Sequence, residues 1–425
     1  MENIFNALRN RGFVEQVTDE RAVSELLSES ISCYIGFDPT APTLHVGSLV
    51  PIMALMHMQR SGHKPIVLVG GGTGMIGDPS GKTKAREILT KAQIEENAQA
   101  IKKQFSRYIG FGKDKARLFN NADWLLNLGY VEFLRDIGCH FSVNRMLTAE
   151  SYKARLKTGL NFIEFNYMLL QAYDFLYLHK HYHCLLQMGG NDQWGNILAG
   201  IDLVRRIEGN EVYGITFPLI ITASGNKMGK TEEGAIWLDE DLTSPYEYYQ
   251  FWINVDDADV GRFLKLFTFL PLEEIEVVET MRGKDLNKAK SILAFEATKI
   301  THGEEKAMEA WKTSVSAFGC QEIDSRLMPS STVPRGSITD DLDGMPTSVV
   351  DREVLEKGIS AFELFTDVGL CVTRNEARRL IGQKGGYVNG EPVGKYDEII
   401  SLKNLKDGNI ILRSGKKKYH RIIVK

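Results

Sequence analysis

A strand, a loop, a helix and a second strand follow one another near the start of the sequence, and this pattern restricts the fold more than any other feature. Residues 31–37 form an apolar run rich in β-formers, residues 38–42 interrupt it with two prolines, and residues 44–60 carry apolar side chains at helical spacing. A second strand-like run follows at 65–70. We expect the two strands to be parallel, because a parallel pair needs such a crossover connection.

The same alternation recurs later in the chain. A short apolar run at 184–188 ends in Gly189 and Gly190 and leads into helical spacing from 194 to 207. Strands that alternate with helices are typical of α/β folds with a parallel sheet. We therefore predict a Rossmann-like, doubly wound parallel sheet whose ligands bind beyond the carboxyl ends of the strands.

Length and composition restrict the class of protein. A chain of 425 residues exceeds the usual size of one hydrophobic core, which predicts two or three domains. The net charge of −4 argues against a protein that coats nucleic acid without selectivity. Five scattered cysteines without Cys-x-x-Cys spacing indicate neither a disulfide framework nor a zinc site, and they fit a cytoplasmic location. The composition of the first residues and the length of the apolar runs predict no targeting segment and no association with a membrane.

The second half of the chain changes character twice. Helical spacing is dense from 243 to 309, which predicts a separate helical domain. Residues 326–349 have the composition of a linker, and the tail beyond them is rich in lysine and arginine.

The loop after the first strand has the character of an anion site. Asp38, Thr40 and His45 lie on or just after this loop, where a helix begins and free backbone N–H groups favour phosphate. Gly47 would let a nucleotide lie close to the backbone. The alternative is that His45 only opens the helix and Gly47 only allows close packing.

A second short motif supports the phosphate interpretation. Lys227-Met228-Gly229-Lys230-Thr231 follows a β-prone run at 216–222, and two lysines on a glycine-containing loop suit a charge that builds up on phosphoryl oxygens. The alternative is a solvated basic turn, which would leave the first motif unexplained.

Three other patterns suggest sites that we set aside. Gly72 to Gly77 matches the dinucleotide fingerprint, but Pro79 follows too soon for the required helix. Gly81-Lys82-Thr83 resembles the end of a phosphate-binding loop that lacks its earlier glycine. The alternating histidines of 179–183 have no further ligand at metal spacing, so we expect an exposed, extended approach to the next strand and no metal site.

One helix has the features of a substrate pocket. Tyr167, Gln171 and Asp174 fall at i, i+4 and i+7 in the helical stretch 161–177, which places them on one face. A polar stripe usually faces water. Here the flanking residues are nearly all apolar, so the stripe is expected to be buried and to need polar partners.

Taken in order, these motifs resemble those of bacterial-type tyrosyl-tRNA synthetases, which are class I aminoacyl-tRNA synthetases. The resemblance extends over nearly the whole chain. The segments that carry it are Tyr34 to Thr40, His45 to Ser48, Gly77 to Ser80, Tyr167-x-x-x-Gln171-x-x-Asp174, Gly190 to Asn196, Lys227 to Thr231, Ala377 to Ile381 and Gly386 to Gly390.

The resemblance implies a domain organisation. Residues 1–225 would form the Rossmann-like catalytic domain, with an inserted dimerisation region around 120–160. Residues 226–325 would hold the lysine-containing loop and an α-helical anticodon-region domain. A linker at 326–350 would lead to a small α+β, S4-like RNA-binding domain at 351–425.

It also implies roles for individual residues. Substrate tyrosine would be held at its phenolic hydroxyl by Tyr34 and Asp174, at its ammonium group by Asp78, Tyr167 and Gln171, and near its carboxylate by Gln193. The residues expected to bind ATP are Gly36, Asp38, His45, Gly47, Ser48, Gly190, Asp192 and Lys230. The residues expected to act on the departing pyrophosphate are Thr40, His45, Lys82, Arg86, Lys227, Lys230 and Thr231. Ser48 stands where many class I enzymes have a second histidine.

The implied reaction is the activation of L-tyrosine with ATP, accompanied by Mg²⁺, and the transfer of tyrosine to tRNA(Tyr) by a homodimer. No tightly bound cofactor and no metal site of the protein's own are expected. Two alternatives stay open at this point. The chain could be a tryptophanyl-type synthetase or a related nucleotidyltransferase, or a synthetase-derived RNA-binding factor without catalytic activity.

Overall fold

The computed structural model describes residues 3–80, 89–156, 159–223, 225, 228–231, 234–318, 323–335, 346–406, 408–415 and 418–425. The chain divides into two compact units. The first comprises Met1–Ser244 with Asp256–Met281, and the second comprises Pro245–Val255 with Arg282–Lys425. The boundaries predicted at 225, 325 and 350 stay predictions.

A mostly parallel sheet forms the centre of the first unit. Within the described residues it has six strands in the order β1-β6-β5-β2-β3-β4, and only β1 runs antiparallel to its neighbour. The strands are β1 (Gln16–Val17), β2 (Ser32–Phe37), β3 (Lys64–Val69), β4 (Arg117–Asn120), β5 (Cys184–Gly190) and β6 (Tyr213–Phe217). The order reverses between β2 and β5, so this pair marks the topological switch point of the sheet.

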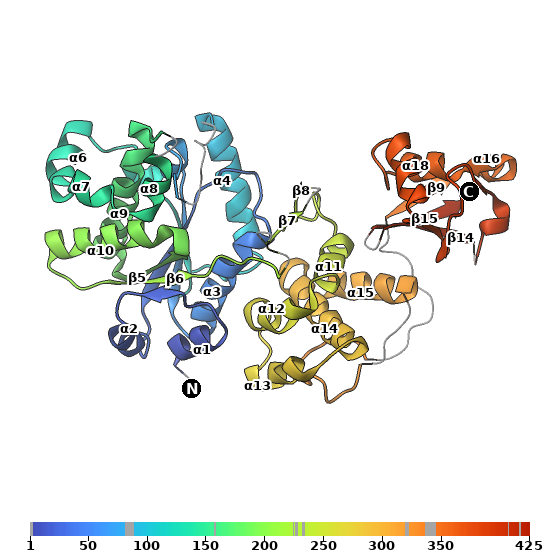
Figure 1. Cartoon of the computed structure of the whole chain (residues 1–425). Helices are drawn as coiled ribbons and strands as arrows, with labels where there is room; N and C mark the ends of the chain where they lie inside the picture. Colours follow the sequence, from blue (N-terminus) through green and yellow to red (C-terminus); the bar gives the residue numbers. More distant parts are fainter. Residues whose placement is uncertain are drawn as a thin grey trace. The chain divides into compact units, whose positions relative to one another are not determined.

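Helices cover both faces of this sheet, which confirms the doubly wound fold predicted from the sequence. Figure 1 shows α9 (Phe162–Tyr182) and α10 (Trp194–Glu208) on one side, and α3 (Leu49–Arg60) and α4 (Lys91–Phe105) on the other. The side chains of Tyr34, Leu68 and Phe175 belong to the buried core between sheet and helices. Burial of such side chains contributes about 1.5–3 kcal/mol each, and it is what fixes α9 against the sheet.

The first unit also contains short elements. They are α1 (Ile4–Asn10), α2 (Glu20–Leu26), α5 (Ala122–Leu125), α6 (Tyr130–Asp136), α7 (Val143–Met146), α8 (Glu150–Leu156), β7 (Lys230–Thr231), β8 (Gly234–Ala235), α12 (Val260–Phe267) and α13 (Leu272–Ile275). A buried ion pair joins α8 to α9, with Arg155 Nη2 2.8 Å from Glu164 Oε2.

Two local predictions were wrong. The histidine segment is not extended: residues 179–182 are the last turn of α9, and His183 ends the helix with φ of 51°. The rings of Tyr177 and His181 pack 4.3 Å apart along this turn, which favours continuation of the helix. The strand expected at 216–222 lies earlier in the chain, because β6 ends at Phe217 before a proline that has no N–H to donate.

The second unit contains the helices α11 (Pro245–Ile253), α14 (Lys284–His302) and α15 (Glu304–Phe318). α11 packs against both of the others and buries Tyr248 and Trp252. Part of the predicted linker is bound to this bundle, because Ser331 Oγ and the N–H of Thr332 donate to Glu296 Oε1 on α14. The described part of the chain contains no helix long and apolar enough to cross a membrane.

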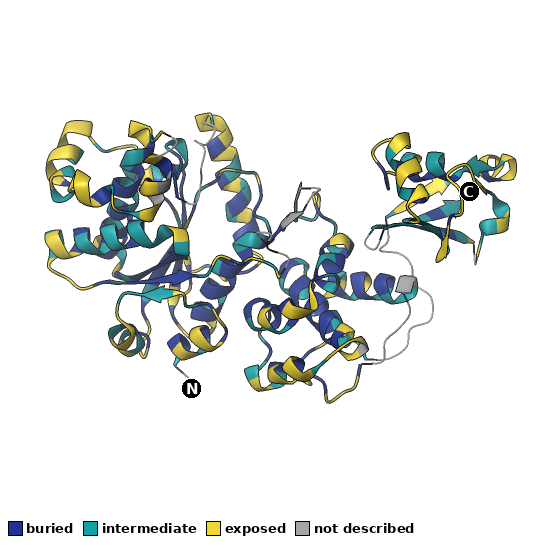
Figure 2. Cartoon of the chain, viewed as in Figure 1, coloured by how far each residue is buried: buried dark blue, intermediate teal, exposed yellow. Residues whose placement is uncertain are grey.

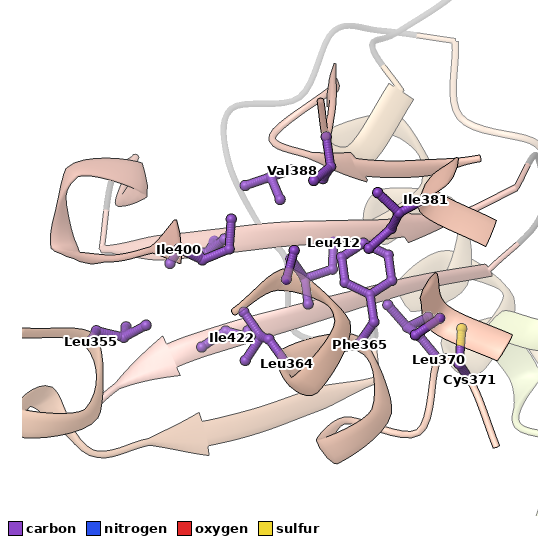
Figure 3. Close-up of a cluster of buried hydrophobic side chains, with 14 residues drawn as sticks. Leu355, Leu364, Phe365, Leu370, Cys371, Ile381, Val388, Ile400, Leu412 and Ile422 are labelled. Carbon is purple, nitrogen blue, oxygen red and sulfur yellow. The ribbon is translucent and has the colours of Figure 1, made fainter. Parts of the chain in front are cut away.

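The C-terminal part of the second unit has its own hydrophobic core. A five-stranded sheet, counted over the described residues, has the order β12-β11-β14-β15-β9. Figure 3 shows Phe365, Ile381 and Leu412 meeting between this sheet and its helices. The elements are β9 (Thr347–Val350), α16 (Arg352–Lys357), β10 (Ile359–Ser360), α17 (Ala361–Asp367), α18 (Arg374–Gly382), β11 (Gly386–Val388), β12 (Glu391–Pro392), β13 (Ile399–Ile400), β14 (Asn409–Ser414) and β15 (Lys418–Val424).

Candidate active site

A cavity of about 360 Å³ opens at the carboxyl ends of β2 and β5, at the switch point of the sheet. The structure brings together in its wall most of the predicted site residues. From the predicted tyrosine set they are Tyr34, Asp78, Tyr167, Gln171, Asp174 and Gln193. From the predicted ATP set they are Gly36, Asp38, His45, Gly47, Ser48, Gly190 and Asp192, and Thr40 is also present. A second cavity of about 1100 Å³ shares His45, Gly47, Gly190 and Asp192 with the first.

A buried carboxylate lies at the deep end of the smaller cavity. Asp174 on α9 is 2% exposed, and its two oxygens accept from Asn121 Nδ2 at 2.9 Å and from Trp124 Nε1 at 2.8 Å. Burial raises the pKa of Asp174 to about 7 against the effect of these two donors, and the charge of Asp38 acts in the same direction as burial. The carboxyl group is therefore held in place while its charge is only partly compensated.

A buried hydroxyl accompanies this carboxylate. Tyr34 on β2 is 1% exposed, and its OH has no hydrogen-bond partner among the described residues. Burial raises the pKa of Tyr34, and the charge of Asp174 raises it further. A buried polar atom without a partner is costly, so the pair suits a ligand whose hydroxyl can both accept from Tyr34 and donate to Asp174.

A chain of hydrogen bonds connects this end of the cavity to the loop after β2. Asn121 Nδ2 donates to Thr73 Oγ1 at 3.0 Å, and Thr73 Oγ1 donates to Asp38 Oδ1 at 2.7 Å. Tyr167 OH donates to the other oxygen of Asp38 at 2.8 Å. Gly70 makes this arrangement possible, because a Cβ there would lie 2.0 Å from Asp38 Oδ1.

A second polar network lies on the other side of the cavity. Gln193 Nε2 donates to Asp78 Oδ2 at 2.7 Å, and the N–H of Ser80 donates to Asp78 Oδ1 at 2.9 Å. Asn196 Nδ2 donates to Oε1 of Gln193 and to Oε1 of Gln171, both at 3.0 Å. The predicted face of Tyr167, Gln171 and Asp174 on α9 therefore does point into a polar site.

The two glycine-containing motifs lie against each other. His45 forms an isolated β-bridge with Trp237, and the N–H of Ile236 donates to the carbonyl of Gly229 at 3.0 Å. Gly229 has φ of +79°, and a Cβ on it would lie 3.0 Å from Gly47 N. Two motifs that are far apart in the sequence thus form one surface, as the phosphate interpretation requires.

The ring of His45 has a defined orientation. Its Nδ1 accepts from the N–H of Gly47 at 2.9 Å, so in the neutral ring the proton lies on Nε2. The surroundings of position 47 give a steric reason for glycine there, and the predicted close approach of a nucleotide stays a prediction. A Cβ there would lie 2.6 Å from Cε1 of His45 and 3.2 Å from the carbonyl oxygen of Met228.

Five predicted residues lie wholly or partly outside the described structure. Lys82, Arg86 and Lys227 lie outside the described residues, and for Lys230 and Thr231 only the backbone of β7 is described. Over the described ranges, no group of three or more His, Cys, Asp or Glu side chains could hold a metal ion. The four cysteines in that part of the chain are free.

Sequence reasoning did not identify Thr73, Asn121, Trp124 or the role of Asn196. Asn121 directly follows the short strand β4, so its place at the carboxyl end of a parallel strand is the signal that could have revealed it. The run at 117–120 is too short and too mixed in polarity to stand out as a strand.

Comparison with known proteins gives consistent matches. Residues 27–319 match the family model described as tRNA synthetases class I (W and Y), and residues 337–422 match the tyrosine–tRNA ligase SYY-like C-terminal domain. The chain is 61% identical to a tyrosine–tRNA ligase of Syntrophus aciditrophicus, over 99% of this chain and 98% of that protein. It is 57% identical to a tyrosine–tRNA ligase of Desulfatibacillum aliphaticivorans, over 99% of both.

A solved structure is also similar. The C-terminally truncated mitochondrial tyrosyl-tRNA synthetase of Aspergillus nidulans superposes with a TM-score of 0.68 at 31% identity, covering 75% of this chain and 95% of that one.

Proposed function

The chain belongs to the class I tRNA synthetases of the tryptophan and tyrosine group, and from this premise we propose that it is a tyrosine–tRNA ligase. It activates L-tyrosine with ATP to tyrosyl-adenylate and pyrophosphate, and then transfers tyrosine to the 3′ adenosine of tRNA(Tyr). The observation that carries the choice of tyrosine is the pair of Tyr34 and Asp174 at the deep end of the cavity, because it matches both hydrogen-bonding functions of a phenolic hydroxyl.

The rest of the cavity suits the remainder of the amino acid. Asp78 and the oxygen of Tyr167 present acceptors to an ammonium group, because the Tyr167 hydrogen is already donated to Asp38. Gln193 presents an amide near the position of the carboxylate. Asp192 and Gly190, which line both cavities, would hold the ribose of ATP.

Activation requires no general base from the protein. The tyrosine carboxylate is already a nucleophile at neutral pH: it attacks the α-phosphorus of ATP, and the bond to the bridging oxygen breaks as pyrophosphate leaves. The protein's contribution is positioning and charge stabilisation. Thr40 and the Nε2 side of His45 face this step in our proposal, together with Lys82, Arg86, Lys227, Lys230 and Thr231.

Mg²⁺ would be brought by ATP. The described residues build no cluster of acidic or histidine side chains that could hold it alone, so ATP phosphates would supply most of its ligands. The ion would neutralise charge on the phosphates.

The transfer step needs an RNA partner, and we assign tRNA binding in part to the C-terminal domain. Its separate hydrophobic core supports an independent role. Removal of residues 346–425 should leave tyrosine-dependent formation of adenylate intact and strongly reduce charging of tRNA. An equal loss of both activities would instead give this domain a role in stabilising the catalytic unit.

We also propose that the protein is a cytoplasmic homodimer. Large apolar side chains with high exposure occur between residues 126 and 163, on α6 to α8 and the start of α9, where Figure 2 colours many residues as exposed. They include Tyr130, Val131 and Phe162. Exposed apolar side chains that gather into a patch are typical of an interface. Sedimentation at several protein concentrations tests this, with Val131→Glu as the variant expected to dissociate.

The deciding experiment is ATP–pyrophosphate exchange with each of the twenty amino acids and no tRNA. Exchange with tyrosine alone would support the proposal. Exchange with tryptophan would overturn the roles of Tyr34 and Asp174 and favour a tryptophanyl-type enzyme. No exchange by folded protein would favour an RNA-binding factor without catalytic activity.

A further inference from the structure

Asn196 lies directly behind the wall of the tyrosine cavity. It is the third residue of α10 and is 3% exposed. Asp78, Gln171 and Gln193 line the cavity, whereas Asn196 does not belong to that wall in the part of the chain that the structure describes. Any effect of Asn196 on a bound amino acid must therefore pass through its neighbours.

The orientation of its amide follows from the charge of Asp78. A carboxylate only accepts hydrogen bonds, and Asp78 already accepts from the N–H of Ser80 at 2.9 Å. The end of the Gln193 amide that lies 2.7 Å from Asp78 must then be its NH₂ group. The oxygen of Gln193 consequently faces Asn196, and Asn196 must present its own NH₂ group in return.

The same NH₂ group fixes a second glutamine. Asn196 Nδ2 lies 3.0 Å from Oε1 of Gln171 and 3.4 Å from Oγ of Ser80. Gln171 comes from α9 and Gln193 from the turn before α10, so one buried amide sets the polarity of side chains from two elements. Asp78 and Asn196 together fix the Gln193 amide, whereas the Gln171 amide is oriented by its contact with Asn196.

We propose that Asn196 is a positioning residue for recognition of the zwitterionic end of the amino acid. By holding both glutamine oxygens, it turns an N–H of Gln193 toward Asp78 and leaves the other N–H of Gln193 for the substrate carboxylate. The oxygen of Gln171 keeps a lone pair that can accept from the ammonium group. Asp78 is thereby kept as an oriented acceptor for the ammonium group. This inference rests on the proposed function, because it assumes that the cavity binds tyrosine.

Two variants test the polarity. Asn196→Ala removes the donor, and Asn196→Asp keeps the shape but presents an acceptor to the two glutamine oxygens. If the amide of Gln193 turns over to relieve this repulsion, its oxygen faces Asp78 instead. One contact is therefore repulsive in either orientation of the Gln193 amide. We expect both variants to weaken tyrosine binding by roughly ten- to a hundredfold, the size of a lost hydrogen bond to a charged group.

A ligand without the zwitterion separates this role from a general distortion. p-Cresol carries only the phenol, so its binding, measured by competition against tyrosine, should change less than twofold or so in both variants. Ile197→Val, a conservative change of the next buried residue on α10, is the matched control and should leave both affinities unchanged. In a double-mutant cycle, Asn196→Ala should weaken tyrosine binding less in the Gln193→Ala background than in the unaltered protein, because only its effect through Gln171 then remains.

The outcomes separate the two claims. If the unaltered protein neither binds tyrosine nor shows tyrosine-dependent exchange, the proposed function fails, and this inference fails with it. If the unaltered protein is active but the variants bind tyrosine normally, only the role of Asn196 is overturned. Equal weakening of tyrosine and p-cresol would also overturn it, because that result indicates a distorted pocket.

Discussion

In the absence of ligand, Asp174→Asn should become more stable relative to the unaltered protein as the pH rises from 5 to 8. The pKa of Asp174 is raised from its ordinary 3.8 to about 7 because the carboxyl group is buried. Between these two values the native state binds more protons than the unfolded state, so stability falls as pH rises from about 4 to about 7 and is level above. The penalty at pH 8 is about 4 kcal/mol, since the pKa changes by about three pH units at about 1.4 kcal/mol each.

The variant removes the titrating group, so the difference in unfolding free energy between the two proteins should change with pH. Integration of the same linkage gives a change of about 3 kcal/mol between pH 5 and pH 8, in favour of the variant. The change with pH does not depend on costs that are the same at every pH. One such cost arises because an N–H of Asn121 or Trp124 would face the new NH₂ group.

Urea unfolding of the whole protein, followed by tryptophan fluorescence at four or five pH values, measures this quantity. Asp114→Asn, at an exposed position, is the control and should give a curve parallel to that of the unaltered protein. Saturating tyrosine should stabilise the unaltered protein and have little effect on Asp174→Asn. If the difference in unfolding free energy between the two proteins stays constant from pH 5 to pH 8, the pKa of Asp174 is not raised by burial.

Three further predictions concern other parts of the site and its support. Trp124→Phe removes a donor from Asp174 and should raise its pKa further, so that tyrosine affinity, measured by calorimetry as a function of pH, falls most near neutrality. Gly229→Ala places a Cβ on a residue with φ of +79° and against Gly47, and should lower the rate of exchange by roughly tenfold or more with an unchanged KM for tyrosine, as steady-state kinetics would test. Arg155→Met leaves Glu164 as a buried charge without its cation and should lower the free energy of unfolding by about 3–5 kcal/mol, measured in urea. The double variant Arg155→Met with Glu164→Leu should recover most of this loss.

Short sequence patterns predicted the elements whose conformation depends mainly on residues close by in the chain. The strand at 31–37 and the helical face of Tyr167, Gln171 and Asp174 follow from apolar runs and from a period of 3.6 residues, and both are present. The histidine segment was misread because alternating histidines fit a strand as well as a helix end. Packing of Tyr182 against Phe119, with ring centroids 4.3 Å apart, favours the helix, and the sequence near residue 182 does not reveal this contact.

The polar support of the cavity could not be predicted for a different reason. Asn121 contacts Thr73 and Asp174, which are 48 and 53 residues away along the chain. These contacts exist only because β3 and β4 are neighbours in the sheet and α9 packs across them. Strand order is a property of the whole domain, and no short pattern encodes it.

The hydrogen-bonded chain from Asp174 through Asn121, Thr73 and Asp38 to Tyr167 has a consequence for pocket redesign. An engineer who replaces Asp174 to admit a different side chain also leaves one N–H of Asn121 without its acceptor, and any turn of Asn121 would disturb its second hydrogen bond, to Thr73, and through Thr73 the position of Asp38. Selections that diversify only the residues around the phenol ring should therefore return catalysts with poor turnover. Libraries that vary positions 73, 121 and 174 together should return active variants in which all three residues have changed.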